Sequence, residues 1–348
     1  MPGPTPAQPE TDDGVSILLP FRNAESTLEE CLDSIQQQTF QAFELLAIDD
    51  HSSDSGHRRV REQARQDPRI RLLTNPGRGL VEALNFGLRQ ARHSLIARMD
   101  ADDRMLPQRL QLQYDHLNRH PSLSVLGSQT RLFPDEAVTS GAKEYLRWQN
   151  GCITAKQIAD NIYMEAPFAH PSVMFRRAVI LRAGGYRQGP FPEDYDLWLR
   201  LHQAGKQMAK LPHVLLEWRE GAGRTSRTDP RCSRDAFDRL RAHYLSKDPL
   251  LLQRRGQLVI WGAGRRTRKR VRHLLDRNFR PMAWIDIDPR KIGNRLDEVP
   301  VRSPAWLERQ KRKPLILCYV ARHGAREQIA AYLNNLGYQS GSDYLMIG

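Results

Sequence analysis

The sequence predicts an α/β protein with two units, each built from short apolar strands that alternate with amphipathic helices. Two observations support this prediction. The alternation runs from Val15 to Leu126, and a second, shorter round of it begins at Gln257. Alternation of this kind is typical of βαβ units around a mostly parallel sheet. The 348 residues also suffice for two domains, each with a core of its own.

The strands of the first unit are expected where short apolar runs occur, and the helices where apolar residues recur three and four positions apart. Ser26 and Glu29 form a capping box that would start the first helix. Gly77 and Gly79 open another helix, and Pro107 suits the first turn of a third. The expected strands are Val15–Leu19, Phe43–Ile48, Arg69–Leu73, Leu95–Met99 and Leu123–Leu126.

Less regular sequence follows. Residues 134–165 lack a clean period, so we expect an irregular insertion there. A strand or helix near Val173–Leu181 and a helix near Tyr195–Ala204 end the first unit. Residues 219–235 are polar and rich in glycine and arginine, which predicts a loop or linker.

The second unit repeats the alternation on a smaller scale, and the turn Gly262-Ala263-Gly264 follows its first strand. Its expected elements are the strands Leu258–Trp261, Met282–Ile287 and Pro314–Val320 and the helices Arg268–Leu275, Pro304–Arg309 and Ala325–Leu336. The predicted organisation is a disordered tail over residues 1–13, a first domain over 14–218, a linker over 219–256 and a second domain over 257–348.

Composition limits the setting. The four cysteines are widely spaced and form no C-x-x-C pair, so the sequence offers neither a zinc site nor a disulfide framework, and a reducing compartment is expected. The proline-rich, acidic start has no basic and apolar signal-peptide regions. No apolar run approaches the ~18–20 residues of a membrane span. We therefore expect a cytoplasmic protein.

The net charge of +13 is unevenly placed. Residues 1–218 contain 25 Lys and Arg against 27 Asp and Glu, a net of −2, and residues 219–348 carry the remaining +15. One interpretation is an anionic partner: nucleic acid, the lipid headgroups of a membrane that the protein contacts peripherally, or a phosphate-bearing acceptor. The other is a solvated arginine-rich surface, and charge balance alone does not separate the two.

Carboxylates gather where the predicted strands end. One strand runs into Asp49-Asp50, and another into Asp100-Ala101-Asp102-Asp103. In open parallel sheets ligands bind beyond the carboxyl ends of the strands, so these carboxylates would converge on one edge. A divalent cation with a preference for oxygen, Mg²⁺ or Mn²⁺, would relieve their repulsion and bring phosphates with it. A turn with a helix N-cap is the plainer alternative.

Six motifs follow one another along the first unit. They are VSILLPFRNAESTLEECLDSIQQQTFQAFELLAIDDHSSD, NPGRGLVEALNFGL, ARMDADD, HPSVMFRRAV, GGYR and PEDYDLWLRL. In this order they resemble glycosyltransferase family 2, which has the GT-A fold, here joined to a second, smaller Rossmann-like α/β domain. The resemblance covers roughly residues 14–220. It implies an inverting enzyme that moves a sugar from a nucleotide-diphosphate donor, a UDP-sugar by expectation, to a hydroxyl of a polysaccharide, glycolipid or glycoprotein acceptor.

The resemblance also implies roles on the donor side. The segment with Pro20, Phe21 and Asn23 resembles part of the nucleobase pocket, in which the Asp50 carboxylate would accept the uracil N3–H. The D-x-D motif implies Asp102 as the main ligand of Mn²⁺ or Mg²⁺, with Asp100 nearer the ribose and both Asp100 and Asp103 as further candidate ligands.

On the acceptor side, Glu193-Asp194 resembles the family's E-D pair, with Asp194 as the general base and Glu193 orienting it or binding an acceptor hydroxyl. His170 resembles a position that lines the acceptor side, and a structural histidine is the alternative. Trp198 is expected to pack beneath Asp194. Asp196 is expected to be an acid of the helix's first turn rather than a catalytic residue.

Arg224 and Arg227 lie where a loop could close over the donor, and guanidinium forks suit a diphosphate. A solvated linker is the alternative for this segment.

The second unit has Gly262-x-Gly264 between a strand and a helix, with Asp286 ending the next strand, which favours a dinucleotide site. Thr267 replaces the third glycine and weakens the match. The unit also resembles the Rossmann-like nucleotide-sugar-binding domain of some bacterial sugar acyltransferases. We predict an anion site at Gly262, Gly264 and Arg265. The arginines and lysine expected to concentrate charge around it are Arg265, Arg266, Arg268, Lys269, Arg270 and Arg272.

Three alternatives stay open at this point. The second domain could be purely structural. The chain could be a sugar-nucleotide oxidoreductase that uses the Gly262 turn, or a basic protein that binds nucleic acid through the +15 region. The last is disfavoured because the sequence carries no RNA-recognition or helix-turn-helix signature.

Overall fold

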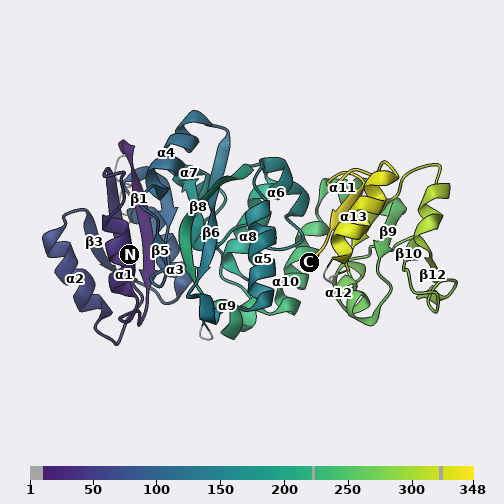
Figure 1. The fold of residues 1–348 in the computed structure, drawn as a ribbon, viewed down its shortest axis with the longest axis horizontal. Helices are drawn as coiled ribbons and strands as arrows, with labels where there is room; N and C mark the ends of the chain where they lie inside the picture. Colours follow the sequence, from purple (N-terminus) through teal and green to yellow (C-terminus); the bar gives the residue numbers. More distant parts are fainter. Residues whose placement is uncertain (1–10, 222–223, 321–323) are drawn as a thin grey trace, which may run out of the picture.

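The computed structural model describes residues 11–221, 224–320 and 324–348, so most of the expected tail over residues 1–13 lies outside the described residues. Two sheets organise these residues, at opposite ends of an elongated molecule (Figure 1). The first has eight strands in the order β3-β2-β1-β4-β7-β6-β8-β5, and the second has six in the order β11-β12-β10-β9-β13-β14.

The first half of the large sheet is parallel, as predicted. Every residue of its second strand is buried, which explains why Phe43–Ile48 is apolar apart from Glu44. Its strands are β1 (Thr11–Phe21), β2 (Phe43–Asp49), β3 (Ile70–Thr74) and β4 (His93–Arg98). The helices that connect them are α1 (Leu28–Gln36), α2 (Gly56–Gln66) and α3 (Leu80–Gln90).

The second half of the large sheet is mixed. The strand β7 pairs antiparallel with both β4 and β6, while β6 pairs parallel with β8. The further strands of this half are β5 (Arg104–Met105), β6 (Leu123–Phe133), β7 (Met174–Arg176) and β8 (Gln207–Arg219). The helices between them are α4 (Arg109–Arg119), α7 (Arg177–Arg182) and α8 (Glu193–Gln203). The region expected as a strand or helix near Val173–Leu181 is therefore a short strand followed by a short helix.

Two local expectations are wrong. The capping box at Ser26 does not form, because the helix N-cap is Thr27, whose hydroxyl instead donates to the Ala101 carbonyl at 3.0 Å. Residues 134–165 are not irregular: they contain α5 (Ser140–Gly151) and α6 (Ala155–Asn161). Threonine side chains cap both helices, and Thr154 with Gln157 forms a true capping box.

The small sheet has its first strand, β9, at the centre, with later strands added on both sides. This order is typical of doubly wound nucleotide-binding folds. Its strands are β9 (Leu258–Trp261), β10 (Ala283–Ile285), β11 (Arg295–Leu296), β12 (Val299–Arg302), β13 (Leu315–Cys318) and β14 (Tyr344–Met346). The helices are α12 (Arg265–Leu275) and α13 (Ala325–Asn335), and Pro304–Arg309 forms a 3₁₀ helix.

The stretch expected as a linker, residues 219–256, contains regular structure. It holds α9 (Thr225–Thr228), α10 (Arg234–Leu245) and α11 (Pro249–Gln253). One apolar cluster includes Trp198 of α8, Leu240 of α10 and Leu274 of α12, so α10 is packed between the two sheets (Figure 1). We propose that the second domain begins near residue 257, with α10 and α11 as a packed junction before it.

Across the three described ranges, no helix combines the length and the apolar character that crossing a membrane requires.

Candidate active site

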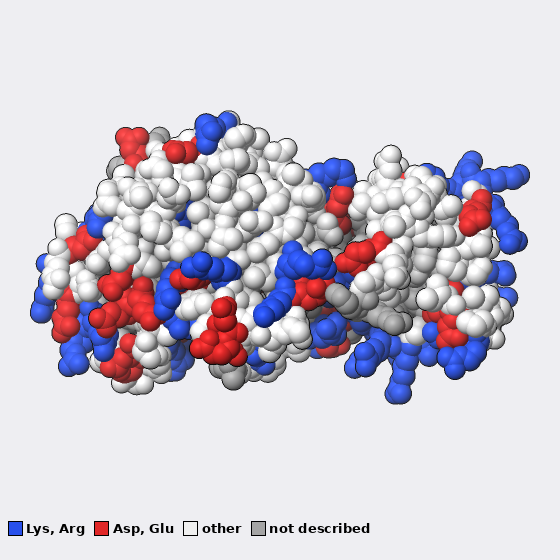
Figure 2. All heavy atoms as spheres, in the orientation of Figure 1, with Lys and Arg blue, Asp and Glu red and all other residues white. Residues whose placement is uncertain are grey.

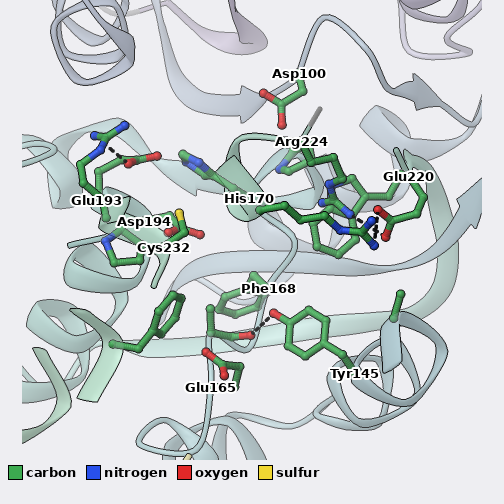
Figure 3. A pocket seen from close by; sticks show the side chains of 18 of the residues that line it. Asp100, Tyr145, Glu165, Phe168, His170, Glu193, Asp194, Glu220, Arg224 and Cys232 are labelled. Atoms are coloured by element: carbon green, nitrogen blue, oxygen red, sulfur yellow. Dashed lines mark hydrogen bonds and ion pairs between the residues drawn. The ribbon is translucent and has the colours of Figure 1, made fainter. Parts of the chain in front are cut away.

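A cavity of about 580 Å³ opens where β4, α8, β8 and α10 meet. It brings together seven of the residues that the sequence analysis singled out, and Figure 3 shows most of their side chains facing the same space. These seven are Asp100, Asp102, His170, Glu193, Asp194, Arg224 and Arg227. The cavity thus joins residues that lie far apart in the sequence.

The acidic cluster lies where β4 leaves the sheet. Ligand atoms of Asp100, Asp102 and Asp103 all lie within 4.8 Å of one another. Asp103 is 1% exposed, and one of its oxygens accepts the Arg219 backbone N–H at 2.7 Å. Its other oxygen, Oδ2, has no hydrogen-bond partner among the described residues. An orphaned buried carboxylate oxygen is costly unless something binds it.

Burial and neighbouring negative charge raise the pKa of Asp102, with Asp100 as the main neighbour. The same causes raise the pKa of Asp103 well above its usual range. Carboxylates that destabilise one another in this way are stabilised by a divalent cation, and their oxygens are the ligands that Mg²⁺ and Mn²⁺ prefer. The donor set and the orphaned oxygen therefore fit such an ion.

Arg98 is a cavity residue that sequence reasoning missed. It ends β4, it is 2% exposed, and its Nη1 forms an ion pair with Asp100. The pair draws the Asp100 carboxylate toward a fixed positive charge. The available signal was an arginine at the end of an otherwise apolar strand, two residues before the D-x-D motif.

Glu193 and Asp194 occupy the first turn of α8, where the helix dipole favours negative charge. Asp194 Oδ1 accepts the Tyr195 backbone N–H at 2.7 Å. Burial, followed by the negative charge of Glu193, raises the pKa of Asp194 to about 7. Burial also raises the pKa of Glu193, and Arg231 Nη1 lies 3.7 Å from its carboxylate. Asp194 is thus a carboxylate that can exchange a proton near neutral pH.

His170 lines the cavity but is largely enclosed. Its Nε2 lies 2.9 Å from the Tyr186 hydroxyl, and its ring meets the Trp198 ring edge to face. Burial, with a further contribution from the charge of Arg98, lowers the pKa of His170 well below its usual value. The imidazole is therefore neutral at physiological pH, which suits hydrogen bonding rather than charge stabilisation.

The two remaining α8 residues follow expectation. Trp198 is fully buried and packs edge to face on Phe168, as predicted. Asp196 is a buried first-turn acid that accepts from Arg200 Nε at 2.8 Å and from the Tyr244 hydroxyl at 2.5 Å. Because these partners occupy the Asp196 carboxylate, it supports the packing of α8 against α10.

Arg224 and Arg227 share one acidic partner. The Glu220 side chain is 2% exposed, and its carboxylate forms ion pairs with Arg224 at 3.2 Å and with Arg227 at 2.9 Å. Figure 3 shows Arg224 and Glu220 beside each other at the cavity edge. The Arg224 guanidinium also lies 4.0 Å above the Trp218 ring. Both cations therefore line the cavity with part of their charge already balanced.

The structure does not bring the four predicted nucleobase residues into this cavity. Among the described residues that line it, none of Pro20, Phe21, Asn23 and Asp50 appears. Asp50 accepts the Gly79 backbone N–H with both oxygens, at 2.9 and 3.0 Å, and so holds the start of α3. Asn23 has a left-handed backbone, and its side-chain oxygen accepts from the backbone N–H and the hydroxyl of Ser53. Asn23 therefore links the loops that follow β1 and β2.

Other cavity residues had no recognisable sequence signal, because most of them come from the unread insertion and from the expected linker. Tyr145 lies on α5, its hydroxyl donating to the Ala166 carbonyl at 3.0 Å. Trp218 lies near the end of β8. Further cavity residues from the insertion and the linker include Glu165, Glu220, Arg231, Cys232, Phe237 and Arg241.

The glycine turn of the small sheet is partly closed by its own neighbours. Gly262 has a φ of +111°, and a Cβ there would lie 2.9 Å from Thr267 Oγ1, so the threonine fills space that a third glycine would leave open. Asp286 Oδ2 accepts the Ala263 backbone N–H at 2.8 Å and lies 3.2 Å from Lys291 Nζ.

Gly264 is the N-cap of α12, and Arg265, the first residue of that helix, is exposed. One expectation about the charge cluster around this turn is wrong. The Arg270 side chain is buried and pairs with Asp238 of α10.

Comparison with known proteins defines the class to which this fold and cavity belong. Residues 16–184 match the glycosyl transferase family 2 model. The amylovoran biosynthesis glycosyltransferase AmsE of Erwinia amylovora is 33% identical over 210 residues, which cover 60% of this chain and 76% of that protein. The chain is therefore a glycosyltransferase, and it belongs to family 2.

Two further comparisons agree. The UDP-Gal:alpha-D-GlcNAc-diphosphoundecaprenol beta-1,3-galactosyltransferase of Escherichia coli is 30% identical over 193 residues, covering 55% of this chain and 68% of that protein. The structure of S. aureus TarS 1–349 in complex with UDP-GlcNAc superposes with a TM-score of 0.54 at 17% identity, over 68% of this chain and 67% of that one. The large sheet and its helices thus have the GT-A fold.

Proposed function

We propose that this enzyme transfers a sugar from a nucleoside-diphosphate donor, a UDP-sugar in the first instance, to a hydroxyl group of a cell-surface glycan or glycolipid precursor, with inversion at the anomeric carbon. The observation that carries the proposal is that Asp194 lines the same cavity as Asp100 and Asp102. An inverting displacement needs a base on the acceptor side and charge neutralisation on the leaving-group side, and one cavity offers both.

On the donor side, Asp102 and Asp103 would hold Mg²⁺ or Mn²⁺. When bound, such an ion would offset the charge that develops on the leaving diphosphate. Arg98 keeps Asp100 on the neighbouring position, where it can face the donor's ribose. Arg224, just before α9, and Arg227, on α9, offer guanidinium forks to the phosphates.

On the acceptor side, Asp194 takes the proton of the attacking hydroxyl. The new bond joins that oxygen to the anomeric carbon while the bond from the carbon to the phosphate oxygen breaks, so configuration inverts. With a pKa of about 7, Asp194 is ionised in a large fraction of molecules at neutral pH and is still basic enough to accept the proton. Burial raises the pKa of Asp194 most, and the negative charge of Glu193 adds to the rise. The neutral His170 can hydrogen-bond a sugar hydroxyl.

The acceptor half of the cavity has aromatic walls. Tyr145, Phe168 and Phe237 line it, and sugar rings pack favourably on such faces. The relatives support a glycan precursor, because one is named for amylovoran biosynthesis and another for transfer to a GlcNAc-diphosphoundecaprenol. We therefore propose a saccharide linked to a lipid through a diphosphate as the acceptor class.

The basic C-terminal region fits such an acceptor. Figure 2 shows Lys and Arg side chains projecting from the part of the surface that belongs to the small sheet. The +15 carried by residues 219–348 would draw the enzyme to anionic lipid headgroups, where a lipid-linked acceptor resides. This peripheral contact is part of the proposal.

The test is a transfer assay with the full chain. UDP-Glc, UDP-Gal, UDP-GlcNAc and GDP-Man are each incubated with Mg²⁺ or Mn²⁺ and a synthetic GlcNAc-diphospho-alkyl acceptor, with the matching alkyl glycoside lacking the diphosphate as control. We expect release of nucleoside diphosphate and a product whose new linkage, by NMR, is inverted relative to the donor. A retained configuration, or no consumption of any donor, would overturn the proposal.

A further inference from the structure

A chain of buried ion pairs runs from the small sheet's helix α12 to the wall of the active-site cavity. Its centre is Asp238 of α10, whose side chain is 5% exposed. Arg270 of α12 donates from Nε to both Asp238 oxygens at 3.1 Å and from Nη2 at 3.0 Å. From the other side, Arg241 Nη1 donates to Asp238 Oδ1 at 2.9 Å. One carboxylate therefore binds two guanidinium groups from different parts of the fold.

Arg241 is the member of this chain that reaches the cavity. Its side chain is 3% exposed and pairs through Nη2 with Glu165 Oε1 at 3.1 Å, and both residues line the cavity. Its Nε also lies 3.3 Å from the hydroxyl of Tyr195, the residue that directly follows Asp194 in the sequence. The guanidinium is thus fixed by three oxygen partners, one on each of its nitrogens.

These contacts lie on the acceptor half of the cavity. In Figure 3, Glu165 lies on the opposite side of the cavity from Asp100, and Asp194 lies between these two residues. The acidic cluster and the donor therefore occupy one side, while Arg241 and Glu165 are part of the other. A change in the position of Arg241 would therefore affect the acceptor side of the cavity more than the donor side.

Arg270 is itself anchored to the edge of the small sheet. Its Nη1 donates to the Gly348 carbonyl at 2.8 Å and lies 3.4 Å from the Tyr319 carbonyl, and Nη2 lies 3.4 Å from the Ile347 carbonyl. Because the Asp238 carboxylate is held between the two arginines, loss of Arg270 would leave it to pair with Arg241 alone. Buried charges that lose a partner reorganise their remaining contacts.

Resting on the proposed function, we propose that Arg270, Asp238 and Arg241 are positioning residues through which the C-terminal domain fixes the acceptor side of the active site. The domain then contributes to acceptor recognition without contacting the donor. This role differs from anion binding at the Gly262 turn, because it depends on the buried face of α12 rather than on its exposed N-terminus.

The experiment compares Arg270→Met with Arg272→Met in the full chain. Arg272 lies on the same helix but is 79% exposed and makes only a distant pair with Asp276, so it is the matched control. The acceptor is the synthetic GlcNAc-diphospho-alkyl compound of the transfer assay. For Arg270→Met we expect the acceptor KM to rise about fivefold or more, which is the usual scale of coupling between sites. The donor KM and the rate of donor hydrolysis without acceptor should stay within about twofold.

A double-mutant cycle separates positioning from general loosening. If Arg270 acts through Arg241, then Arg270→Met should add almost nothing to the acceptor KM in an Arg241→Met background. Effects that multiply independently would overturn the proposal. Thermal unfolding checks that each variant is folded. If Arg270→Met does not fold, Arg270→Lys, which keeps a donor to Asp238, replaces it in the cycle, and a smaller rise in acceptor KM is expected.

Failure of this inference and failure of the proposed function give different results. If the wild-type chain consumes no nucleotide sugar, the proposed function is wrong. If the wild type transfers sugar and Arg270→Met has the same acceptor KM as Arg272→Met, only the positioning role is wrong.

Discussion

Both sheets of this protein are built from βα units, but the turns that follow their strands differ in whether their polar groups are satisfied. In the large sheet, the turn after β4 leaves Asp103 with a buried, unpartnered oxygen beside two further carboxylates. In the small sheet, the turn after β9 has its Ala263 N–H taken by Asp286 and its free space filled by Thr267. A polar residue after a strand thus indicates a site only when its own neighbours leave it unsatisfied.

The two regions also differ in how they use charge. The large sheet concentrates acids around a cavity, where burial and mutual repulsion raise the pKa of Asp102 and Asp103. The small sheet's helix α12 has most of its basic residues exposed, and its buried Arg270 is used for docking against α10. Mutations in the first region should therefore change chemistry, and mutations in the second should change binding.

The largest expected effect comes from Asp194→Asn. The amide keeps the shape but cannot take the acceptor proton, so transfer should fall by on the order of 10²–10⁴ in rate. Nucleotide binding, measured by calorimetry with the metal present, should be nearly unchanged. Asp196→Asn is the matched control on the same turn, and it should lower the melting temperature while retaining most of the rate, since Asp196 pairs with Arg200. Turnover near the wild-type rate by Asp194→Asn would remove Asp194 from the role of base.

The next effect concerns the acidic cluster. Treatment with EDTA should abolish transfer, and Asp102→Ala should weaken metal-dependent binding of the nucleotide donor by roughly 100-fold. The control is Asp135→Ala, an exposed aspartate outside the cavity. Calorimetry that gives equal nucleotide affinity with and without Mn²⁺ would contradict the metal assignment for the large sheet.

A third effect is the dependence of the rate on pH. Because Asp194 acts in its ionised form and has a pKa of about 7, kcat/KM should fall about tenfold per pH unit below neutrality and level off above it. Glu193→Gln removes a neighbouring negative charge, which favours ionisation of Asp194, so the acid limb should move to lower pH. A profile that stays flat from pH 5 to 8, or moves the other way in this variant, would count against the assignment.

The parts of the fold that could be predicted from sequence are those with strong local patterns. Short, mostly apolar runs indicated β1, β2 and β4, because parallel strands are buried on both faces. The acidic cluster around Asp102 was found because it follows a predicted strand, and the first turn of α8 was found because it resembles the family's E-D pair. Thr154 with Gln157 was a readable signal for α6, although the helix that it begins has no clean apolar period.

Two of the missed features, the helix α10 and the residue Arg98, were hidden by buried ion pairs. The helix α10 looks like a polar linker because its Asp238 and Arg241 are charged, yet both are buried through partners that lie far away in the sequence. Arg98 is also buried through an ion pair, although its partner Asp100 lies only two residues along the chain. Buried ion pairs of this kind leave no periodic trace, so local sequence reasoning assigns such residues to the surface.

The smallest expected effect tests the anion site predicted at the Gly262 turn. Gly264 caps α12, so the backbone N–H groups of the first helical turn and the exposed Arg265 can attract a phosphate, while the Asp286 carboxylate opposes it. With EDTA present to weaken the donor site, ADP binding by the full chain at low salt should fall roughly two- to fivefold in Arg265→Glu, the scale of exposed helix-end interactions. Asp286→Asn should raise the affinity by a similar factor, and Arg272→Glu, two turns further along α12, should change it least.

If wild-type protein binds no ADP under these conditions, the turn is structural and the small sheet acts only through its docking face. Tight binding of NAD would instead reopen the oxidoreductase alternative, although Thr267, which occupies the space beside Gly262, makes close approach of a dinucleotide unfavourable.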